Sequence, residues 1–301
     1  MKDKITQLKK AKNAIILAHY YTLPEVQDVA DFVGDSLALS QKAAATDADI
    51  ILFAGVHFMA ETAKILNPQK KVLIPDLDAG CCLADDCSAE RFADFLKDYP
   101  NHTILSYINC SAGVKALSDI IVTSGNALKI VKSLPENEKI VFAPDKNLGH
   151  YICQTLGREM VLWDGVCHVH DRIKPEHIAS LINEYPDAQV IAHPECRREV
   201  LALANFVGST AAMLKHVAQS QDKTFIVVTE RGILYELTKQ NPGKIFIPVN
   251  ASVNGFDGCR SMKLNNLDNI YQALVTEQPE LILDDELSRK AKKAIDRMLS
   301  Y

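Results

Sequence analysis

Short apolar runs of four to six residues alternate along this chain with amphipathic segments long enough to form helices. The run IILFA at 50–54, for instance, is followed by HFMAETAKIL at 57–66 and then by VLIPD at 72–76. Such alternation is typical of parallel strands joined by crossover helices, because parallel neighbours need a long connection. The pattern therefore predicts an α/β protein with short parallel sheets.

The same arrangement recurs three times. Segments that start at residues 15, 104 and 190 each read as an apolar strand, a polar turn, a short helix, a small apolar piece and a second helix. A polar residue ends the first strand, and seventeen positions later a Ser or Thr precedes the second helix: His19 with Ser36, Tyr107 with Ser124, and His193 with Thr210. Identical spacing without gaps indicates an internal repeat.

Each repeat predicts one small αβα domain, at residues 14–100, 101–186 and 187–280. Residues 1–13 and 281–301 are expected as flanking helices packed on this body, and further helices are expected at 88–99, 174–185, 267–276 and 284–300. Because no low-complexity linker separates the repeats, the three domains should share surfaces in one compact body.

Composition narrows the classes of function. The 301 residues are 48% hydrophobic and 24% charged, as in ordinary globular enzymes, and the formal net charge is -5. Such a chain has no basic excess with which to neutralise a nucleic-acid backbone or an anionic membrane. No apolar run approaches the ~20 residues that a bilayer requires, and the run after the N-terminal lysines is too short for a signal peptide. We therefore expect a cytoplasmic protein with neither nucleic-acid nor membrane partners.

Polar side chains stand at the carboxyl ends of the first repeated strands, where open α/β sheets bind their ligands. On an extended strand residues i and i+2 face the same way, so each repeat presents one pair: His19 with Tyr21, Tyr107 with Asn109, and His193 with Glu195. Any one such residue is commonly no more than a satisfied hydrogen-bonding group at a strand end. Three pairs in register predict a binding or catalytic site.

A Ser or Thr close to a glycine opens the second helix of each repeat, as in Ser36, Ser124 and the pair Ser209 and Thr210. Taken singly, each is an ordinary N-cap that contributes about 1 kcal/mol. Three helix N-termini that face a common centre would also offer free N–H groups and positive dipole ends. We therefore expect a small substrate that carries several negative groups.

Eight cysteines are the unusual feature of the composition. In a reducing cytoplasm cysteines are metal ligands, nucleophiles or buried residues more often than disulfides. One cysteine follows the last strand of each repeat: Cys81, Cys167 and Cys259. The other five lack this register and are expected as buried or incidental thiols, although the last lies close to the proposed site: Cys82, Cys87, Cys110, Cys153 and Cys196.

Three thiolates from three domains can hold zinc with water in the fourth position, or an iron-sulfur cluster with one iron left without a cysteine. Spacing alone does not choose between them. Zinc suits a hydrolase, with His168 or His170 as an added ligand, whereas an open iron is a Lewis acid and suits dehydration. A cluster-based sensor of a small dianion is a further alternative, but no output element is visible beyond the repeats.

Several ordered motifs carry a family resemblance across nearly the whole chain. They are GVHFMAETAKIL at 55–66, AGC-x-L-AD around Cys81, WDGVCHVH at 163–170, HPEC at 193–196, VGSTAAM at 207–213 and GC-x-x-MK ending at Lys263. In these motifs the chain resembles quinolinate synthase. The resemblance implies three similar α/β domains in a pseudo-threefold triangle around a central active site, and a transferase of NAD biosynthesis with an oxygen-sensitive [4Fe-4S] cluster. It also implies that iminoaspartate and dihydroxyacetone phosphate condense to quinolinate, with release of phosphate and water.

The resemblance assigns roles to residues as well. It implies cluster ligation by Cys81, Cys167 and Cys259, with one iron not ligated by cysteine, and it favours Cys81 over Cys82 because the family pattern places the ligand directly after Gly80. The substrate-binding residues that it implies are His19, Ser36, Tyr107, Asn109, Ser124, His193, Glu195 and Thr210. An L-aspartate oxidase is the candidate supplier of the imine. Some members carry C-x-x-C-x-x-C in the last loop, but this chain has only Cys259 there, so thiol regulation of that type is not expected.

Three of these residues are expected to carry the chemistry. Glu195 is the best general base or acid, His193 lies beside it, and Tyr21 supplies a catalytic hydroxyl that can shuttle a proton. A closed cavity would raise the pKa of Glu195, whereas cationic iron and a protonated His193 would lower it, so the sequence leaves the direction of that shift open.

Overall fold

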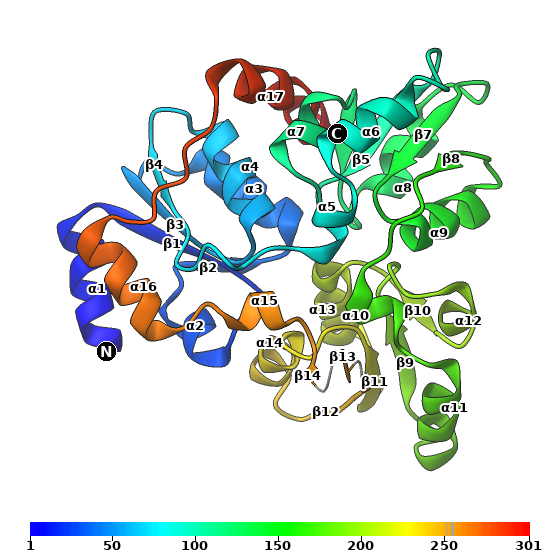
Figure 1. The fold of residues 1–301 in the computed structure, drawn as a ribbon. Coiled ribbons are helices and arrows are strands. Elements are labelled where there is room, and N and C mark those ends of the chain that lie inside the picture. Colours follow the sequence, from blue (N-terminus) through cyan, green and yellow to red (C-terminus); the bar gives the residue numbers. More distant parts are fainter. Residues whose placement is uncertain (251, 254–255) are drawn as a thin grey trace.

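The chain folds into three units of the same construction, each built on a four-stranded parallel sheet, and the three sheets lie around a common centre (Figure 1). This computed structural model describes residues 1–250, 252–253 and 256–301. The first sheet has the order β2 (Phe32–Gly34), β1 (Ala14–His19), β3 (Ile50–Ala54), β4 (Lys71–Leu73). The second has the order β6 (Ile120–Val122), β5 (Thr103–Tyr107), β7 (Ile140–Ala143), β8 (Val161–Leu162). The third has the order β10 (Phe206–Val207), β9 (Gln189–Ala192), β11 (Thr224–Val228), β12 (Ile245–Pro248).

The identical strand order confirms the α/β prediction, and helices make the connections. Along the first sheet they are α2 (Pro24–Val29), α3 (Ser36–Ala45), α4 (His57–Leu66), α5 (Cys82–Asp86) and α6 (Ala89–Leu96). Along the second they are α7 (Ala112–Ala116), α8 (Ala127–Ser133), α9 (Lys146–Leu156), α10 (His168–Asp171) and α11 (Pro175–Glu184). Along the third they are α12 (Arg198–Leu201), α13 (Thr210–Gln219) and α14 (Ile233–Gln240).

The remaining elements lie at the two ends of the chain. The N-terminal helix is α1 (Lys2–Ala11), and after the third sheet come β13 (Ser252–Val253), β14 (Phe256–Asp257), α15 (Arg260–Lys263), α16 (Leu267–Thr276) and α17 (Asp285–Leu299). The helices expected at 88–99, 174–185, 267–276 and 284–300 correspond to α6, α11, α16 and α17, with ends within three residues of the prediction. Within the described residues, no helix is long and apolar enough to cross a membrane.

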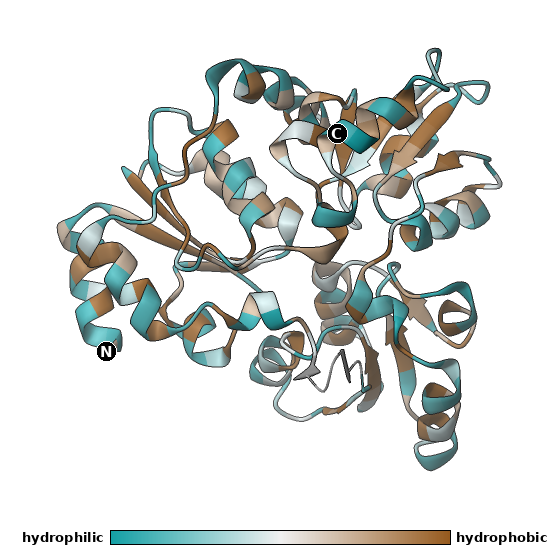
Figure 2. Ribbon diagram, in the orientation of Figure 1, coloured by the Kyte–Doolittle hydropathy of each residue, from teal (hydrophilic) through white to brown (hydrophobic). Residues whose placement is uncertain are grey.

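Apolar strands explain why each sheet is buried on both faces. Alternate residues of β3 join two separate cores, with Ile51 and Phe53 in one and Ile50, Leu52 and Ala54 in the other. Figure 2 shows the same contrast along the chain, since the strands are hydrophobic whereas the helices mix hydrophobic and hydrophilic residues. A strand covered on both sides reads as a continuous apolar run, which is the pattern that the sequence shows.

One side-chain hydrogen bond recurs at equivalent positions in the three units, and it holds the residue before each edge strand to the neighbouring strand. The amide of Ile16 donates to Asp31 Oδ2 and the amide of Ile104 donates to Asp119 Oδ2, both at 2.8 Å. In the third unit the amide of Val190 donates to Asn205 Oδ1, also at 2.8 Å. Each acceptor lies fifteen positions after its donor, so the repeat read from the strand ends extends to structural side chains.

The terminal helices tie the units together. Ile5 of α1 and Ile270 and Leu274 of α16 are buried in a core with residues of β1 and β3, so α16 covers the first sheet although it follows the third in sequence. Helix α17 packs against α7, β6 and α4, and its Ile295 is fully buried. The division at 14–100, 101–186 and 187–280 stays a prediction.

Candidate active site

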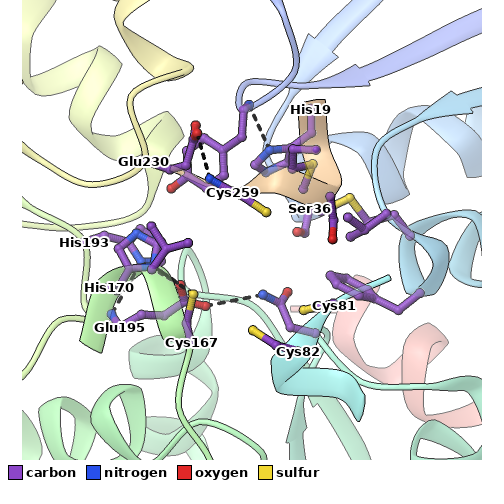
Figure 3. A pocket seen from close by; sticks show the side chains of 18 of the residues that line it. His19, Ser36, Cys81, Cys82, Cys167, His170, His193, Glu195, Glu230 and Cys259 are labelled. Atoms are coloured by element: carbon purple, nitrogen blue, oxygen red, sulfur yellow. Dashed lines mark hydrogen bonds and ion pairs between the residues drawn. The ribbon is translucent and has the colours of Figure 1, made fainter. Parts of the chain in front are cut away.

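The three units meet at a central pocket of about 250 Å³ at the carboxyl ends of their strands (Figure 3). Every site residue that the sequence predicts lines it: His19, Tyr21, Ser36, Cys81, Tyr107, Asn109, Ser124, Cys167, His193, Glu195, Thr210 and Cys259. Because they come from segments more than two hundred positions apart, only the folded chain brings them together.

The helix starts converge as expected, but the capping residues differ from the prediction. Ser36 is the first residue of α3 and the N-cap is Asp35, whose Oδ1 accepts a hydrogen bond from the amide of Ala38 at 3.0 Å. Ser124 lies in the turn before α8, three residues ahead of its first helical residue. Ser36 therefore opens α3 as predicted, but the expectation that Ser36 and Ser124 are N-caps is wrong, because Asp35 caps α3 from the position before Ser36, and the N-cap of α8 is Asn126, two residues after Ser124.

Only the third unit follows the expected capping scheme. Ser209 is the N-cap of α13 and accepts a hydrogen bond from the amide of Ala212 at 3.3 Å, so Thr210 is the first helical residue, as Ser36 is in α3. A Cβ atom placed on Gly125 would lie 3.4 Å from Ser209 Oγ and 3.8 Å from Leu37 Cδ2. The three helix starts thus approach each other closely, and a glycine leaves the space for them.

Two histidines at equivalent strand ends adopt the same arrangement. The amide of Tyr21 donates to His19 Nδ1 at 3.1 Å, and the amide of Glu195 donates to His193 Nδ1 at 3.4 Å. Burial is the main cause that lowers the pKa of each ring to about 3. Both rings are therefore neutral at pH 7, with Nδ1 as an acceptor and Nε2–H left as a donor for a ligand.

Glu195 of the third unit is buried, and its carboxylate is held by two partners from the second unit. Its Oε2 lies 2.7 Å from His170 Nδ1, and its Oε1 accepts a hydrogen bond from Asn109 Nδ2 at 3.3 Å. Its 3.5 Å approach to His193 is not an ion pair, because that ring is neutral. Burial alone would raise the pKa of Glu195, but the neighbouring rings of His170 and His193 and the side-chain hydrogen bonds from His170 and Tyr107 together outweigh burial, and the pKa falls to about 2. Glu195 is therefore ionised at neutral pH.

A continuous hydrogen-bond chain leads from Glu195 to Tyr21. His170 Nε2 lies 2.8 Å from Thr229 Oγ1, which in turn lies 2.7 Å from the Tyr21 hydroxyl. The His170 ring also stacks on His193, with 4.8 Å between centroids. Burial raises the pKa of Tyr21 well above its usual range, so its hydroxyl is protonated at neutral pH. The sequence predicted Tyr21 and Glu195 but not the two residues that connect them.

The missed residues carried no usable signal in the sequence. The sequence pattern offers His170 only as an added zinc ligand, and Thr229 occupies a register position that Gly55 and Pro144 fill in the other units. Arg260, which lines the pocket and can offer positive charge to an anion, occupies the position after the cysteine that Cys82 and His168 fill in the other units.

Three cysteines from the three units present their thiols to the pocket, as Figure 3 shows. Cys81, Cys167 and Cys259 each precede a short helix, namely α5, α10 and α15. Burial raises the pKa of all three thiols, to about 12 for Cys259. A metal that binds them must therefore displace protons, and a set of soft sulfur donors suits iron-sulfur or zinc chemistry. The donor set fits a cluster.

Of the five remaining cysteines, three are buried in apolar clusters, Cys153 on α9 is half-buried, and Cys82 lines the pocket. Cys87, Cys110 and Cys196 are fully buried in apolar clusters, as expected of structural thiols. Cys82 lies beside Cys81 and also lines the pocket.

Cys167, His170 and Glu195 form a group whose ligand atoms lie within 4.8 Å of one another. His170 Nδ1 is 3.2 Å from Cys167 Sγ, so this group joins the acid-base chain to a proposed ligand.

Comparison with known proteins supplies the context for this pocket. The sequence profile of a family described as "Quinolinate synthetase A protein" matches residues 3–300. Curated relatives include proteins named "Quinolinate synthase" from Trichodesmium erythraeum, 53% identical over 99% of this chain and 92% of the relative, and from Synechocystis sp., 54% identical over 98% and 93%. A protein of the same name from Chloroherpeton thalassium is 50% identical over 99% of this chain and 93% of the relative.

Proposed function

From the premise that this chain belongs to the quinolinate synthase family of NAD biosynthesis, we propose that its central pocket condenses iminoaspartate with dihydroxyacetone phosphate to form quinolinate. The observation that supports this most directly is the pocket itself, which combines three cysteines, neutral histidine donors and an acid-base chain. Membership of the family leaves a zinc hydrolase and a cluster-based sensor without support.

Binding of the substrate acids is proposed for the polar residues of the repeat. The neutral rings of His19 and His193 offer Nε2–H groups, and the N-termini of α3 and α13 offer backbone N–H groups beside Ser36 and Thr210. Tyr107, Asn109 and Ser124 line the same pocket, and Glu195 makes side-chain hydrogen bonds with Tyr107 and Asn109. Two carboxylates and one phosphate of the substrates match such a set of donors.

Proton movement is proposed to follow the chain from Tyr21 to Glu195. An ionised carboxylate can only accept hydrogen bonds, so the ring proton of His170 is on Nδ1, which donates to Glu195. His170 Nε2 is then an acceptor for the Thr229 hydroxyl. The Thr229 oxygen is then the acceptor for the Tyr21 hydroxyl. Removal of a substrate proton by Tyr21 requires that its own proton pass to His170, and Glu195 stabilises the imidazolium that results, as in hydrolase triads.

Cys81, Cys167 and Cys259 are proposed to hold a [4Fe-4S] cluster in which one iron has no cysteine ligand. When bound, the cluster would supply Lewis acidity for the loss of a substrate hydroxyl. The protein's own residues orient the substrates and exclude water, which would otherwise hydrolyse the imine. An L-aspartate oxidase is proposed as the supplier of the imine, and the cytoplasm as the site of the reaction.

The test is made on protein purified without oxygen. Iron and acid-labile sulfide should be present in equal amounts with little zinc, and quinolinate should form from dihydroxyacetone phosphate and freshly generated iminoaspartate. Cys167→Ser should lose the brown iron-sulfur absorption, and Glu195→Gln should keep the absorption but lose turnover. Zinc in place of iron, or full absorption in Cys167→Ser, refutes the cluster, and near-normal turnover in Glu195→Gln refutes the acid-base assignment.

A further inference from the structure

Two buried carboxylates occupy equivalent positions in the second and third units. Asp145 lies two residues after β7, which ends at Ala143, and Glu230 lies two residues after β11, which ends at Val228. Both are fully buried. In the second and third units, the loop that follows this strand therefore carries an acid into the interior, next to the central pocket.

Asp145 connects the start of a helix to one of the proposed cluster cysteines. Its Oδ1 accepts a hydrogen bond from the amide of Leu148 at 2.8 Å, which caps α9. Its Oδ2 accepts a hydrogen bond from the amide of Cys167 at 3.1 Å. The Asp145 side chain thus binds both the start of α9 and the amide of Cys167, and so holds the cysteine backbone at a fixed place beside this helix.

Glu230 makes the corresponding contact in the third unit. Its Oε1 accepts a hydrogen bond from the amide of Cys259 at 3.2 Å and pairs with Lys263 Nζ at 2.9 Å, while its Oε2 accepts from the amide of Gly232 at 2.6 Å. A Cβ atom on Gly232 would lie 2.8 Å from Oε2, and one on Gly258 would collide with Oε1. Glycine at both positions therefore leaves the space that the Glu230 carboxylate occupies.

The first unit shows that the fold does not require an acid at this position. Its equivalent residue is Val56, which is buried and apolar. Burying a carboxylate costs several kcal/mol unless it is fully hydrogen-bonded, so an apolar residue is the cheaper choice for packing alone. The acids recur only where their side chains bind the amide of a proposed ligand cysteine.

We infer that Asp145 and Glu230 are positioning residues that set the direction of the Cys167 and Cys259 thiols toward the cluster. Holding the amide of a cysteine fixes its Cα–Cβ bond and so restricts where Sγ can lie. Outer residues of this kind orient metal ligands, and their loss commonly weakens metal binding 10- to 100-fold. This inference rests on the proposed three-cysteine cluster.

The test compares the isosteric variants Asp145→Asn and Glu230→Gln with wild type, all purified without oxygen. Asparagine caps helices as well as aspartate does, so Asp145→Asn keeps the cap on α9 and replaces only the acceptor for Cys167. The rate at which an iron chelator removes the cluster should rise about 10-fold in each variant. The electron paramagnetic resonance spectrum of the reduced cluster should also change, because the thiolate geometry is altered.

Matched controls separate cluster positioning from general stability. Asp284→Asn removes the carboxylate of an exposed N-cap on α17, and Glu236→Gln removes a buried acid from α14 in the same unit as Glu230. Both should lose iron at the wild-type rate. The unfolding temperature of the apoprotein is recorded for every variant, because a purely structural acid would lower that temperature without changing the spectrum.

Each outcome decides the question. Cluster loss within twofold of wild type with an unchanged spectrum overturns the inference while leaving the proposed function intact. If Asp145→Asn does not fold, Asp145→Ser keeps a capping oxygen and removes the acceptor for Cys167, and failure of both to fold assigns the acid to the fold and also overturns the inference. Wild type that binds no iron and sulfide, or Cys167→Ser that binds both fully, refutes the proposed cluster itself.

Discussion

The hydroxyl of Thr229 connects Tyr21 to His170 in the proposed proton path between Tyr21 and Glu195. Its Oγ1 lies 2.7 Å from the Tyr21 oxygen and 2.8 Å from His170 Nε2, and the residue is 2% exposed. Thr229→Val keeps nearly the same shape and removes only this hydroxyl. The variant therefore interrupts the chain without emptying the site.

The expected magnitude follows from what the hydroxyl does in the structure. Its removal leaves two buried partners unsatisfied, each at a cost of about 1–3 kcal/mol in stability. In the reaction it removes the acceptor for the Tyr21 proton, and a positioned acid-base group contributes roughly 10²- to 10⁴-fold. We expect kcat to fall about 100-fold or more, while iron and sulfide content stays at the wild-type level because the cysteines are untouched.

Quinolinate formation under anaerobic conditions measures this effect, with cluster content recorded on the same samples. Thr229→Ser restores a hydroxyl and should recover most of the rate. Thr62→Val is the matched control, because Thr62 is equally buried and its hydroxyl donates to the Phe58 carbonyl of the same helix, α4, at 2.9 Å. A Thr229→Val enzyme with a full cluster that turns over within fivefold of wild type would show that the proton does not pass through Thr229. Equal loss in the Ser and Val variants would assign the effect to packing.

Three further predictions concern the cluster and the stability of the fold. Cys81→Ser should abolish iron binding, whereas Cys82→Ser should retain iron and sulfide at wild-type content, and the reverse result would exchange the two assignments. Because burial lowers the pKa of His19 and His193 to about 3, the unfolded chain binds more protons between pH 3 and 6.5, so the urea unfolding free energy of the apoprotein should fall as pH drops below 6.5. The two rings contribute up to ~1.4 kcal/mol each per pH unit, and a flat profile from pH 7 to 5 contradicts this. Gly165→Ala should cost about 1–3 kcal/mol, measured by denaturant unfolding, because its Cβ would lie 2.5 Å from a backbone carbonyl oxygen; unchanged stability would contradict that contact.

Local sequence pattern was sufficient for the architecture. Short continuous apolar runs such as that of β3, bounded by polar segments, are typical of strands covered on both faces, and the seventeen-residue spacing placed three such strands in equivalent units. The strand order that these units share confirms that reading. The path of α16 back to the first sheet was not visible, because its apolar face is compatible with any neighbouring sheet.

The capping residues show the limit of local reasoning at the helix starts. Ser36 and Ser124 have the composition of N-caps, yet Asp35 caps α3 and Ser124 stays in the turn. Several polar residues in a row can each cap a helix, and which one does so depends on the backbone angle at which the strand enters the helix.

The sequence by itself determined the three sheets, the residues at their strand ends and the three cysteines in register, because hydrophobic period and spacing are local properties of a repeated segment. Only the tertiary structure decided that His170 and Thr229 connect Glu195 to Tyr21, and that Asp145 and Glu230 bind the amides of two cysteines. The contacts of Thr229 join atoms from different units, whereas those of Asp145 and Glu230 join segments of one unit that helices and strands separate. Such partners are set by how the elements pack around the pocket in three dimensions, which no spacing along the chain records.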